Sequence, residues 1–377
     1  NLPSADHAAR EQELTLDEIS VIAAQAVELG SVWCLITGGE PLLRPDFADI
    51  YLALKRKGLL VSLFTNATLI DEKHIALLKE YPPRDVEITV YGVTRETYER
   101  VTRKKGSFEK FMRGFNLLKA SGLRVRLKAM AIRSNLHEQA AISDFCRKHT
   151  KDFFRFDPQL HLRFDADSAR NSDIRGERLT PEEIVMLERS DTRRQEWMRQ
   201  NCNTLINDAL THRGCNCLFH CDAGRGSFDV GYDGSFRLCS SLWAPETVYD
   251  LRKGTLENAW RSFVPRIRAM SSQRHDFLER CRACRLANLC CGVPPTPTWK
   301  SANWTLTCLI SARWHTPGPM LCGPGKQPLP GDSSCFPGCE GGQKHRGERV
   351  MTLLPGTCST PVGSSAEPPF ASKGPTR

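Results

Sequence analysis

Two groups of residues in this 377-residue chain have types and spacings that could do chemistry. The first is Gly38-Gly39-Glu40-Pro41, which directly follows an apolar run. Two glycines let a ligand approach the backbone closely, and a glutamate can accept hydrogen bonds from an ammonium group. The second is a set of cysteines in the latter half of the chain, which could hold a metal ion or a cluster. Taken alone, the Gly-Gly-Glu-Pro stretch is equally compatible with a simple turn.

Spacing separates the cysteines that could be ligands from the rest. The pattern C-x12-G-x4-C runs from Cys221 to Cys239, and C-x2-C-x5-C begins at Cys281. Sixteen cysteines in a long chain without a visible secretion signal favour metal binding over a disulfide scaffold. Tetrahedral zinc remains open beside iron–sulfur, because cysteines at these spacings suit both. The candidate metal ligands are Cys215, Cys221, Cys239, Cys281, Cys284 and Cys290.

Alternating apolar and amphipathic stretches, from residue 15 to residue 157, predict the elements that position the first group. Helices are expected between strands, and the strands are expected at 32–37, 59–65, 86–91, 124–132 and 152–156. Strict alternation of this kind is typical of a parallel sheet with right-handed crossovers. Ligands bind at the carboxyl ends of the strands in such sheets, and Gly38–Glu40 fall at one such end.

Helix signals support the same alternation. Thr15 and Glu18 have the spacing of a capping box, and the helix that follows is expected to bury Ile19, Ile22, Ala23, Ala26 and Val27. Further helices are expected after Pro45 and over 71–80, 107–121 and 136–149. Cys34 and Cys146 fall in these elements and are expected in the core. Because the chain opens on a helix, one strand of the sheet is expected to be missing upstream.

The chain beyond residue 157 divides into three parts by composition. Residues 158–200 are polar and are expected to be a connector, with a helix that starts at Thr180-Pro181. Residues 201–292 are rich in cysteine and glycine, with short strands expected. Residues 293–377 hold 14 of the 23 prolines and no apolar periodicity, so a disordered tail is expected.

The overall charge does not point to nucleic acid or to a membrane. The net charge is +9, but the basic residues are scattered and form no stripe with interleaved aromatic residues. No apolar run reaches the length of about 18 residues that a spanning helix needs. Without a signal peptide either, the sequence predicts a cytoplasmic protein with no nucleic-acid or membrane partner.

The first half resembles the radical S-adenosylmethionine (radical SAM) enzymes over residues 1–157. The resemblance is carried by "LITGGEPLLRPDF", "LFTNATLI", "ITVYGVTRETYERVT" and "GSFEKFMRGFNLLKASGLRVRLKAMAIRSN". It implies an α/β fold, a partial (β/α)6 barrel, and S-adenosylmethionine as cosubstrate. By resemblance, the cofactor-binding residues are Gly38, Gly39, Glu40, Thr65, Asn66, Thr89 and Lys128. For Thr65 and Thr89 the alternative is an ordinary turn at a strand end, and for Lys128 it is an ordinary position on the surface.

One departure from that family is serious. Its radical-generating 4Fe–4S cluster is held by C-x3-C-x2-C, and this triplet is absent from the sequence. Cys217 and Cys221 have the first spacing, but Gly224 stands in the third position, and Cys335 and Cys339 likewise lead to a glycine. We expect that truncation before the first residue removed the triplet and that this chain does not cleave S-adenosylmethionine.

The cysteine-rich part resembles the SPASM domain, the auxiliary-cluster extension of radical SAM peptide maturases. Within it, "CDAGRGSFDVGYDGSFRLC" has the expected glycine turns and "GTLENAWRSF" resembles the intervening helix. The resemblance implies a small α+β domain over 201–292 with one or two auxiliary 4Fe–4S clusters. Val293 and Pro294 stand where a further cysteine is expected. Codons for "PPTPTWKSANWT" read one base out of register can encode a SPASM continuation, so 293–377 is expected to be out of frame, with a native tail as the alternative.

Together these resemblances imply a radical SAM oxidoreductase or maturase. The intact enzyme would generate a 5′-deoxyadenosyl radical and modify a ribosomal peptide, or alternatively a tetrapyrrole-type cofactor precursor. A reductase or flavodoxin-type protein would supply electrons. A non-catalytic protein that binds zinc or iron–sulfur and interacts with partners is the alternative from another class, and the absent triplet favours it.

Overall fold

The structure is a computed structural model of the chain. It describes residues 11–152, residues 154–200 with short gaps at 155, 159, 161, 163–166, 194 and 197–198, residues 218–219 and 223–273, residue 278, and residues 349–353.

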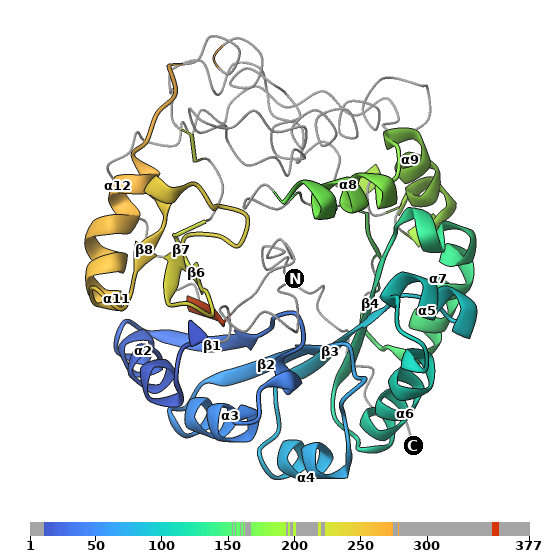
Figure 1. The fold of residues 1–377 in the computed structure, drawn as a ribbon, viewed down its shortest axis with the longest axis horizontal. Coiled ribbons are helices and arrows are strands. Elements are labelled where there is room, and N and C mark those ends of the chain that lie inside the picture. The colour runs from blue at the N-terminus through green and yellow to red at the C-terminus, as the bar shows by residue number, and fades with distance from the viewer. Residues whose placement is uncertain are drawn as a thin grey trace, which may run out of the picture.

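Five parallel strands form a curled half-barrel (Figure 1). They neighbour one another in chain order, and each pair is parallel. This sheet confirms the predicted α/β class and the partial barrel. The strands are β1 (Ser31–Ile36), β2 (Leu60–Thr65), β3 (Asp85–Val90), β4 (Val125–Met130) and β5 (Phe156–Asp157).

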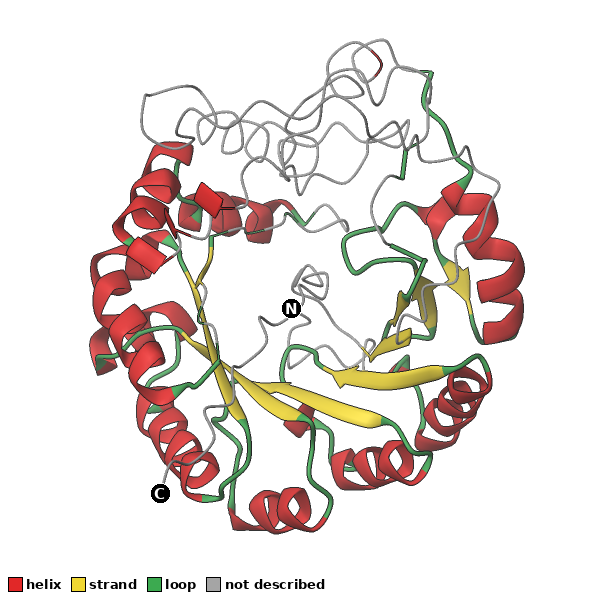
Figure 2. Cartoon of the chain, turned by 180° about the vertical axis from the view of Figure 1, so that it is seen from behind, coloured by secondary structure: helices red, strands yellow, loops and turns green. Residues whose placement is uncertain are grey.

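Helices cover the convex face of the sheet, as Figure 2 shows from the opposite side. Side chains that alternate along the strands, such as Val61, Leu63 and Ile88, are fully buried beneath them. The concave face therefore lies on the other side of the strands. The covering helices are α2 (Leu16–Glu28), α3 (Phe47–Arg56), α4 (Glu72–Glu80), α5 (Arg95–Thr102), α6 (Ser107–Ala120) and α7 (Gln139–His149).

The first helix confirms its predicted start. The Thr15 hydroxyl accepts from the Glu18 amide at 3.2 Å, and the Glu18 carboxylate accepts from the Thr15 amide at 2.8 Å. The expected inward residues Ile19, Ile22, Ala23 and Ala26 are buried. Val27 is 37% exposed, so its inclusion in that face was wrong.

Two elements differ from expectation. The last strand of the half-barrel was expected at 152–156, but β5 comprises only Phe156–Asp157. Helix α5 was not predicted, because only Thr97 and Tyr98 of its eight residues are buried and no apolar stripe marks it. Short 3-10 turns also occur at η1 (Pro41–Leu43) and η2 (Arg133–Glu138).

Residues 158–200, which were predicted to be a connector, contain two helices, α8 (Ser168–Glu177) and α9 (Pro181–Ser190). Thr180 caps α9 with a capping box and Pro181 takes its first turn, as predicted. After the connector the described residues 227–268, which we call the hairpin unit, contain short antiparallel strands and a helical run. Its elements are β6 (Ser227–Val230), β7 (Ser235–Arg237), η3 (Pro245–Thr247), β8 (Tyr249–Asp250), α11 (Leu256–Asn258), η4 (Ala259–Phe263) and α12 (Val264–Arg268).

The sheet continues from β1 into the hairpin unit through a strand of the expected tail. Strand β9 (Arg349–Leu353) lies between β1 and β6 and is parallel to both. The prediction of a disordered tail is therefore wrong for these five residues, and the rest of 293–377 lies outside the described residues. In the described part of the chain, no helix is long and apolar enough to span a bilayer.

Candidate functional site

The Gly-Gly-Glu-Pro stretch lies in the loop that leaves the carboxyl end of β1. The Glu40 carboxylate accepts from the Thr65 hydroxyl at 2.8 Å and from the Asn66 amide at 2.7 Å. It also accepts from the Leu42 amide at 3.2 Å, and through this bond Glu40 is the N-cap of η1. Glu40 thus ties the end of β1 to the end of β2.

Glu40 lies in a desolvated environment. Its residue is only 9% exposed. Burial raises the pKa of this carboxyl above its ordinary value, although the bonds from Asn66, Thr65 and Leu42 and the charge of His74 act in the opposite direction. A carboxylate oxygen has more than one acceptor site, so these three donors leave room for an ammonium group.

Gly39 presents an open side of this loop. A Cβ built on Gly39 would meet no atom within 4 Å. Open space beside a backbone without a side chain lets a ligand come close to the peptide groups. This observation fits a ligand at the loop better than a closed turn packed against its surroundings.

The end of β2 is organised around two polar residues. The Thr65 hydroxyl donates to Glu40 and accepts from the Ala67 amide at 3.0 Å, and Asn66 Oδ1 accepts from the Thr68 amide at 2.9 Å. These bonds are strand-end turn chemistry, the alternative considered for Thr65. Ala67 itself has φ 61°, a left-handed conformation that an L residue rarely adopts.

The end of β3 adds a residue that sequence reasoning missed. Tyr91 hydrogen-bonds to the Thr89 side chain, and burial together with the charge of Glu40 raises the pKa of its phenol. Tyr91 directly follows the "ITV" of β3, so its place at the strand end was a readable signal. Thr89 lies opposite Lys128 in the parallel ladder.

Lys128 is not an ordinary surface lysine. Its side chain is only 12% exposed, and Nζ lies 3.2 Å from Glu87 Oε1. The ammonium also lies 4.7 Å from the centroid of the Phe64 ring, within cation–π range. The seven predicted residues therefore lie at or near the carboxyl ends of β1–β4, and of these Glu40, Thr65 and Asn66 are in direct contact.

Most predicted metal ligands lie outside the described residues. This holds for Cys215, Cys221, Cys281, Cys284 and Cys290. Within the described part of the chain, no group of three or more His, Cys, Asp or Glu side chains could hold a metal ion. The predicted convergence of two cysteine trios stays a prediction, with Cys239 its one described member.

The two cysteines that were predicted to lie in the core, Cys34 and Cys146, do lie there. Cys34 and Cys146 are both fully buried, and burial raises the pKa of each thiol, that of Cys146 to about 12. A thiol that stays protonated at neutral pH is a poor ligand and a poor nucleophile.

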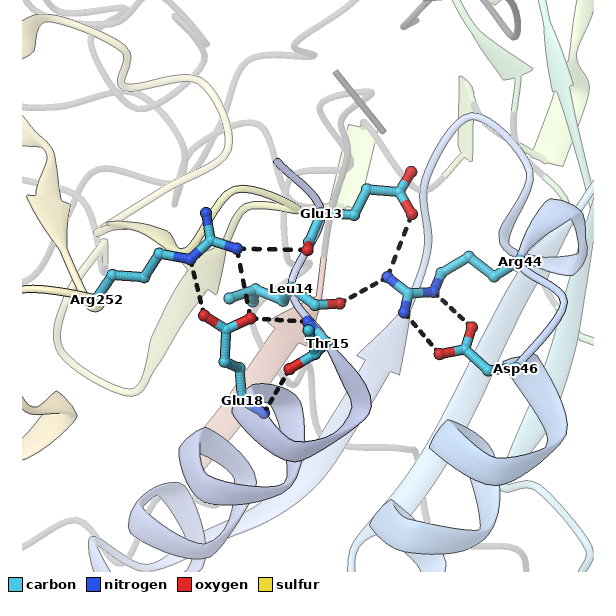
Figure 3. A network of polar contacts seen from close by, with 7 residues as sticks. All are labelled: Glu13, Leu14, Thr15, Glu18, Arg44, Asp46 and Arg252. Atoms are coloured by element: carbon cyan, nitrogen blue, oxygen red, sulfur yellow. Dashed lines mark hydrogen bonds and ion pairs between the residues drawn. The ribbon is translucent and has the colours of Figure 1, made fainter. Parts of the chain in front are cut away.

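A polar network joins the loop after β1 to the hairpin unit (Figure 3). Arg44 donates to both oxygens of Asp46, at 2.9 and 2.8 Å, and to the Leu14 carbonyl at 2.9 Å. From the other side Arg252 Nε donates to Glu18 at 2.8 Å. The segment before α2 is therefore held between the two parts.

Comparison with protein families assigns the first part of the chain. Residues 6–142 match the model of the Radical SAM superfamily. The Fe-coproporphyrin III synthase of Methanosarcina barkeri is 31% identical over 134 residues, which cover 36% of this chain and 33% of that protein. The PqqA peptide cyclase of Gluconobacter oxydans is 28% identical over 124 residues, 33% of this chain and 32% of that protein. The chain thus spans about a third of the length of these relatives.

Solved structures share the fold at low identity. Streptococcus suis SuiB bound to S-adenosylmethionine superimposes with a TM-score of 0.53 at 15% identity, over 74% of this chain and 65% of that one. The anSMEcpe structure with bound AdoMet gives 0.53 at 15% identity, over 78% and 82%. The likeness shows a common fold. The family model that residues 6–142 match is that of the Radical SAM superfamily.

Proposed function

We propose that this chain binds S-adenosylmethionine at the carboxyl ends of β1–β4, as part of a radical SAM enzyme. The observation that carries the proposal is the loop after β1. Its buried Glu40 joins two strand ends while the backbone at Gly39 faces open space. The loop lies within the segment that matches the Radical SAM superfamily.

The residues present fit the methionyl part of this cosubstrate. The Gly39 peptide group borders open space, so a ligand can approach it, and the Gly38 peptide group would contact the same ligand. The Glu40 carboxylate can accept from the ammonium of the ligand. Thr65, Asn66 and Thr89 would line the same site, and Lys128 offers a positive charge. When bound, S-adenosylmethionine supplies the 5′-deoxyadenosyl group that this family uses as a radical.

The residues present do not fit the radical-generating cluster, because no C-x3-C-x2-C occurs in the 377 residues. We therefore propose binding, and no cleavage step, for the chain in hand. The second candidate, a metal-binding protein without catalysis, is favoured by the same observation. Measurement of S-adenosylmethionine binding, together with iron and sulfide content, separates the two. Assay for 5′-deoxyadenosine after anaerobic reconstitution tests the absence of cleavage, because product would show that a cluster is held elsewhere in the chain.

The auxiliary ligands and the substrate are further parts of the proposal. The six candidate cysteines would hold one or two auxiliary 4Fe–4S clusters, and iron and sulfide analysis after reconstitution tests this. For the whole enzyme we propose a ribosomal peptide or a cofactor precursor as substrate. The names of the relatives, a PqqA peptide cyclase and a Fe-coproporphyrin III synthase, support these two classes equally. A reductase or flavodoxin-type donor would complete the reaction.

The binding proposal has a matched test. Gly39→Val fills the open side of the loop, whereas Gly176→Val fills open space in α8, since a Cβ at either glycine meets no atom within 4 Å. Equilibrium dialysis should show that the unaltered chain and Gly176→Val bind S-adenosylmethionine equally, and that Gly39→Val does not. Equal binding by both variants would place the ligand elsewhere.

A further inference from the structure

Four charged side chains alternate in sign on the concave face of the sheet. Asp85 and Glu87 lie on β3, and Arg126 and Lys128 lie on β4. Their neighbours in the strands, such as Ile88 and Leu127, are buried on the convex side, so residues two apart share the concave face. We call these four residues the charge ladder.

The charge ladder runs along the strands toward the candidate site. Arg126 Nη1 lies 3.8 Å from Asp85 Oδ2, and Arg126 Nη2 lies 3.9 Å from Glu87 Oε2. Glu87 Oε1 then lies 3.2 Å from Lys128 Nζ. Because β3 and β4 are parallel, Lys128 is the member nearest their carboxyl ends. Its neighbour at the same level on β3 is Thr89, which is neutral.

At the end nearest the candidate site, the charge ladder therefore carries the positive charge of Lys128. The negative charge that compensates it belongs to Glu87, which lies further from the carboxyl ends of the strands. Glu87 is 8% and Lys128 12% exposed at the side chain, so neither charge is screened by bulk water. Phe64 of β2 lies against the ammonium. Three strands thus restrict a side chain that is otherwise among the most flexible.

We infer that Glu87 is a positioning residue that holds the Lys128 ammonium where the α-carboxylate of S-adenosylmethionine binds. The inference rests on the proposed function. Because the Lys128 side chain is already restricted before the ligand binds, binding costs less side-chain conformational entropy. Glu87 itself lies one step below the ligand and acts through Lys128.

The test compares two ligands that differ only in this carboxylate, S-adenosylmethionine and its decarboxylated analogue. Glu87→Gln keeps the shape of the side chain and removes its charge. We expect it to weaken S-adenosylmethionine binding by about tenfold, the order set by ordering one lysine side chain, and to leave the analogue unchanged. Lys128→Met should act in the same way, and the double variant should lose no more than Lys128→Met alone.

The outcomes separate this inference from the proposed function. If the unaltered chain binds neither ligand, the proposed function fails. If it binds S-adenosylmethionine but Glu87→Gln weakens both ligands equally, Glu87 has a structural role only and the inference is overturned. Unchanged binding of both ligands by Glu87→Gln overturns it as well. Circular dichroism of each variant confirms that the fold is kept before the affinities are compared.

Discussion

Replacement of Glu40 by glutamine tests whether this carboxylate holds the strand ends together. In Glu40→Gln, the amide oxygen can still accept from Thr65 and Leu42, which both donate to Oε1. The amide nitrogen takes the place of Oε2 and faces the Asn66 amide, whose nitrogen lies 2.7 Å from Oε2. The hydrogen bond from the Asn66 amide is lost, and this donor is left without its acceptor.

The expected magnitude follows from that loss. A donor that is left without its acceptor away from water costs about 1–3 kcal/mol, and this cost does not require the carboxyl to be ionised. We therefore expect Glu40→Gln to lower the free energy of unfolding by about 2 kcal/mol at pH 7. Urea denaturation followed by circular dichroism measures it. Glu80→Gln, on an exposed residue of α4, is the control and should change stability by less than about 0.5 kcal/mol. Equal stability of the two variants would refute the role of Glu40.

The pH dependence of this difference has a definite sign. Burial raises the folded-state pKa of Glu40, so the native chain binds this proton more strongly than the unfolded chain. The Glu40 carboxyl therefore stabilises the folded state fully below the ordinary pKa of a carboxyl. This stabilisation declines as the pH rises through the raised folded-state pKa of Glu40. The penalty of Glu40→Gln should accordingly be larger at pH 4.5 than at pH 8, and a penalty that grows with pH would contradict this.

Two further changes probe the surroundings of the site. Arg252→Ala removes the ion pair with Glu18, whose side chains are 36% and 35% exposed, so the loss should stay below about 1 kcal/mol and vanish in 1 M salt. Arg252 first, and then the hydrogen bonds of Thr15, lower the pKa of Glu18 to about 2. The pair should therefore contribute at pH 7 and be lost as the pH falls from about 4 toward 2, measured by urea denaturation. Gly114→Ala places a Cβ 1.9 Å from the Ala67 carbonyl oxygen and should cost about 1–3 kcal/mol in thermal or urea unfolding, whereas Gly176→Ala should cost nothing. Equal stability of the two alanine variants would show that α6 can shift away from Ala67, in the loop after β2, without a cost in stability.

The barrel could be predicted because its signals are local. The capping box of Thr15 and Glu18 and the buried apolar face of α3 from Phe47 to Leu54 can both be recognised from residues that lie within a few helical turns of one another. Helix α5 has no such stripe, since its polar residues leave only Thr97 and Tyr98 inside. Strand β9 could not be foreseen for a different reason. Its partners in β1 are about 300 residues away, and no local pattern encodes such a pairing.

The candidate site could be predicted as a set of positions but not as contacts. Sequence reasoning placed Glu40 at a strand end, because motif and alternation mark that end, and it gave Lys128 only by resemblance. It could not show that Thr65 donates to Glu40, or that Glu87 pairs with Lys128 across two strands. Cross-strand contacts depend on register, and register comes from the packing of the whole sheet.

Backbone hydrogen exchange with and without S-adenosylmethionine tests whether the ligand binds at the carboxyl ends of β1–β4. We expect slower exchange of amides in 37–42 and 65–68 when the ligand is present, because these loops meet at Glu40 beside the proposed site. Amides of β6–β8 in the hairpin unit should exchange at unchanged rates and serve as the internal reference. Protection confined to the hairpin unit, or no protection at ligand concentrations that saturate binding, would contradict the assignment of this site.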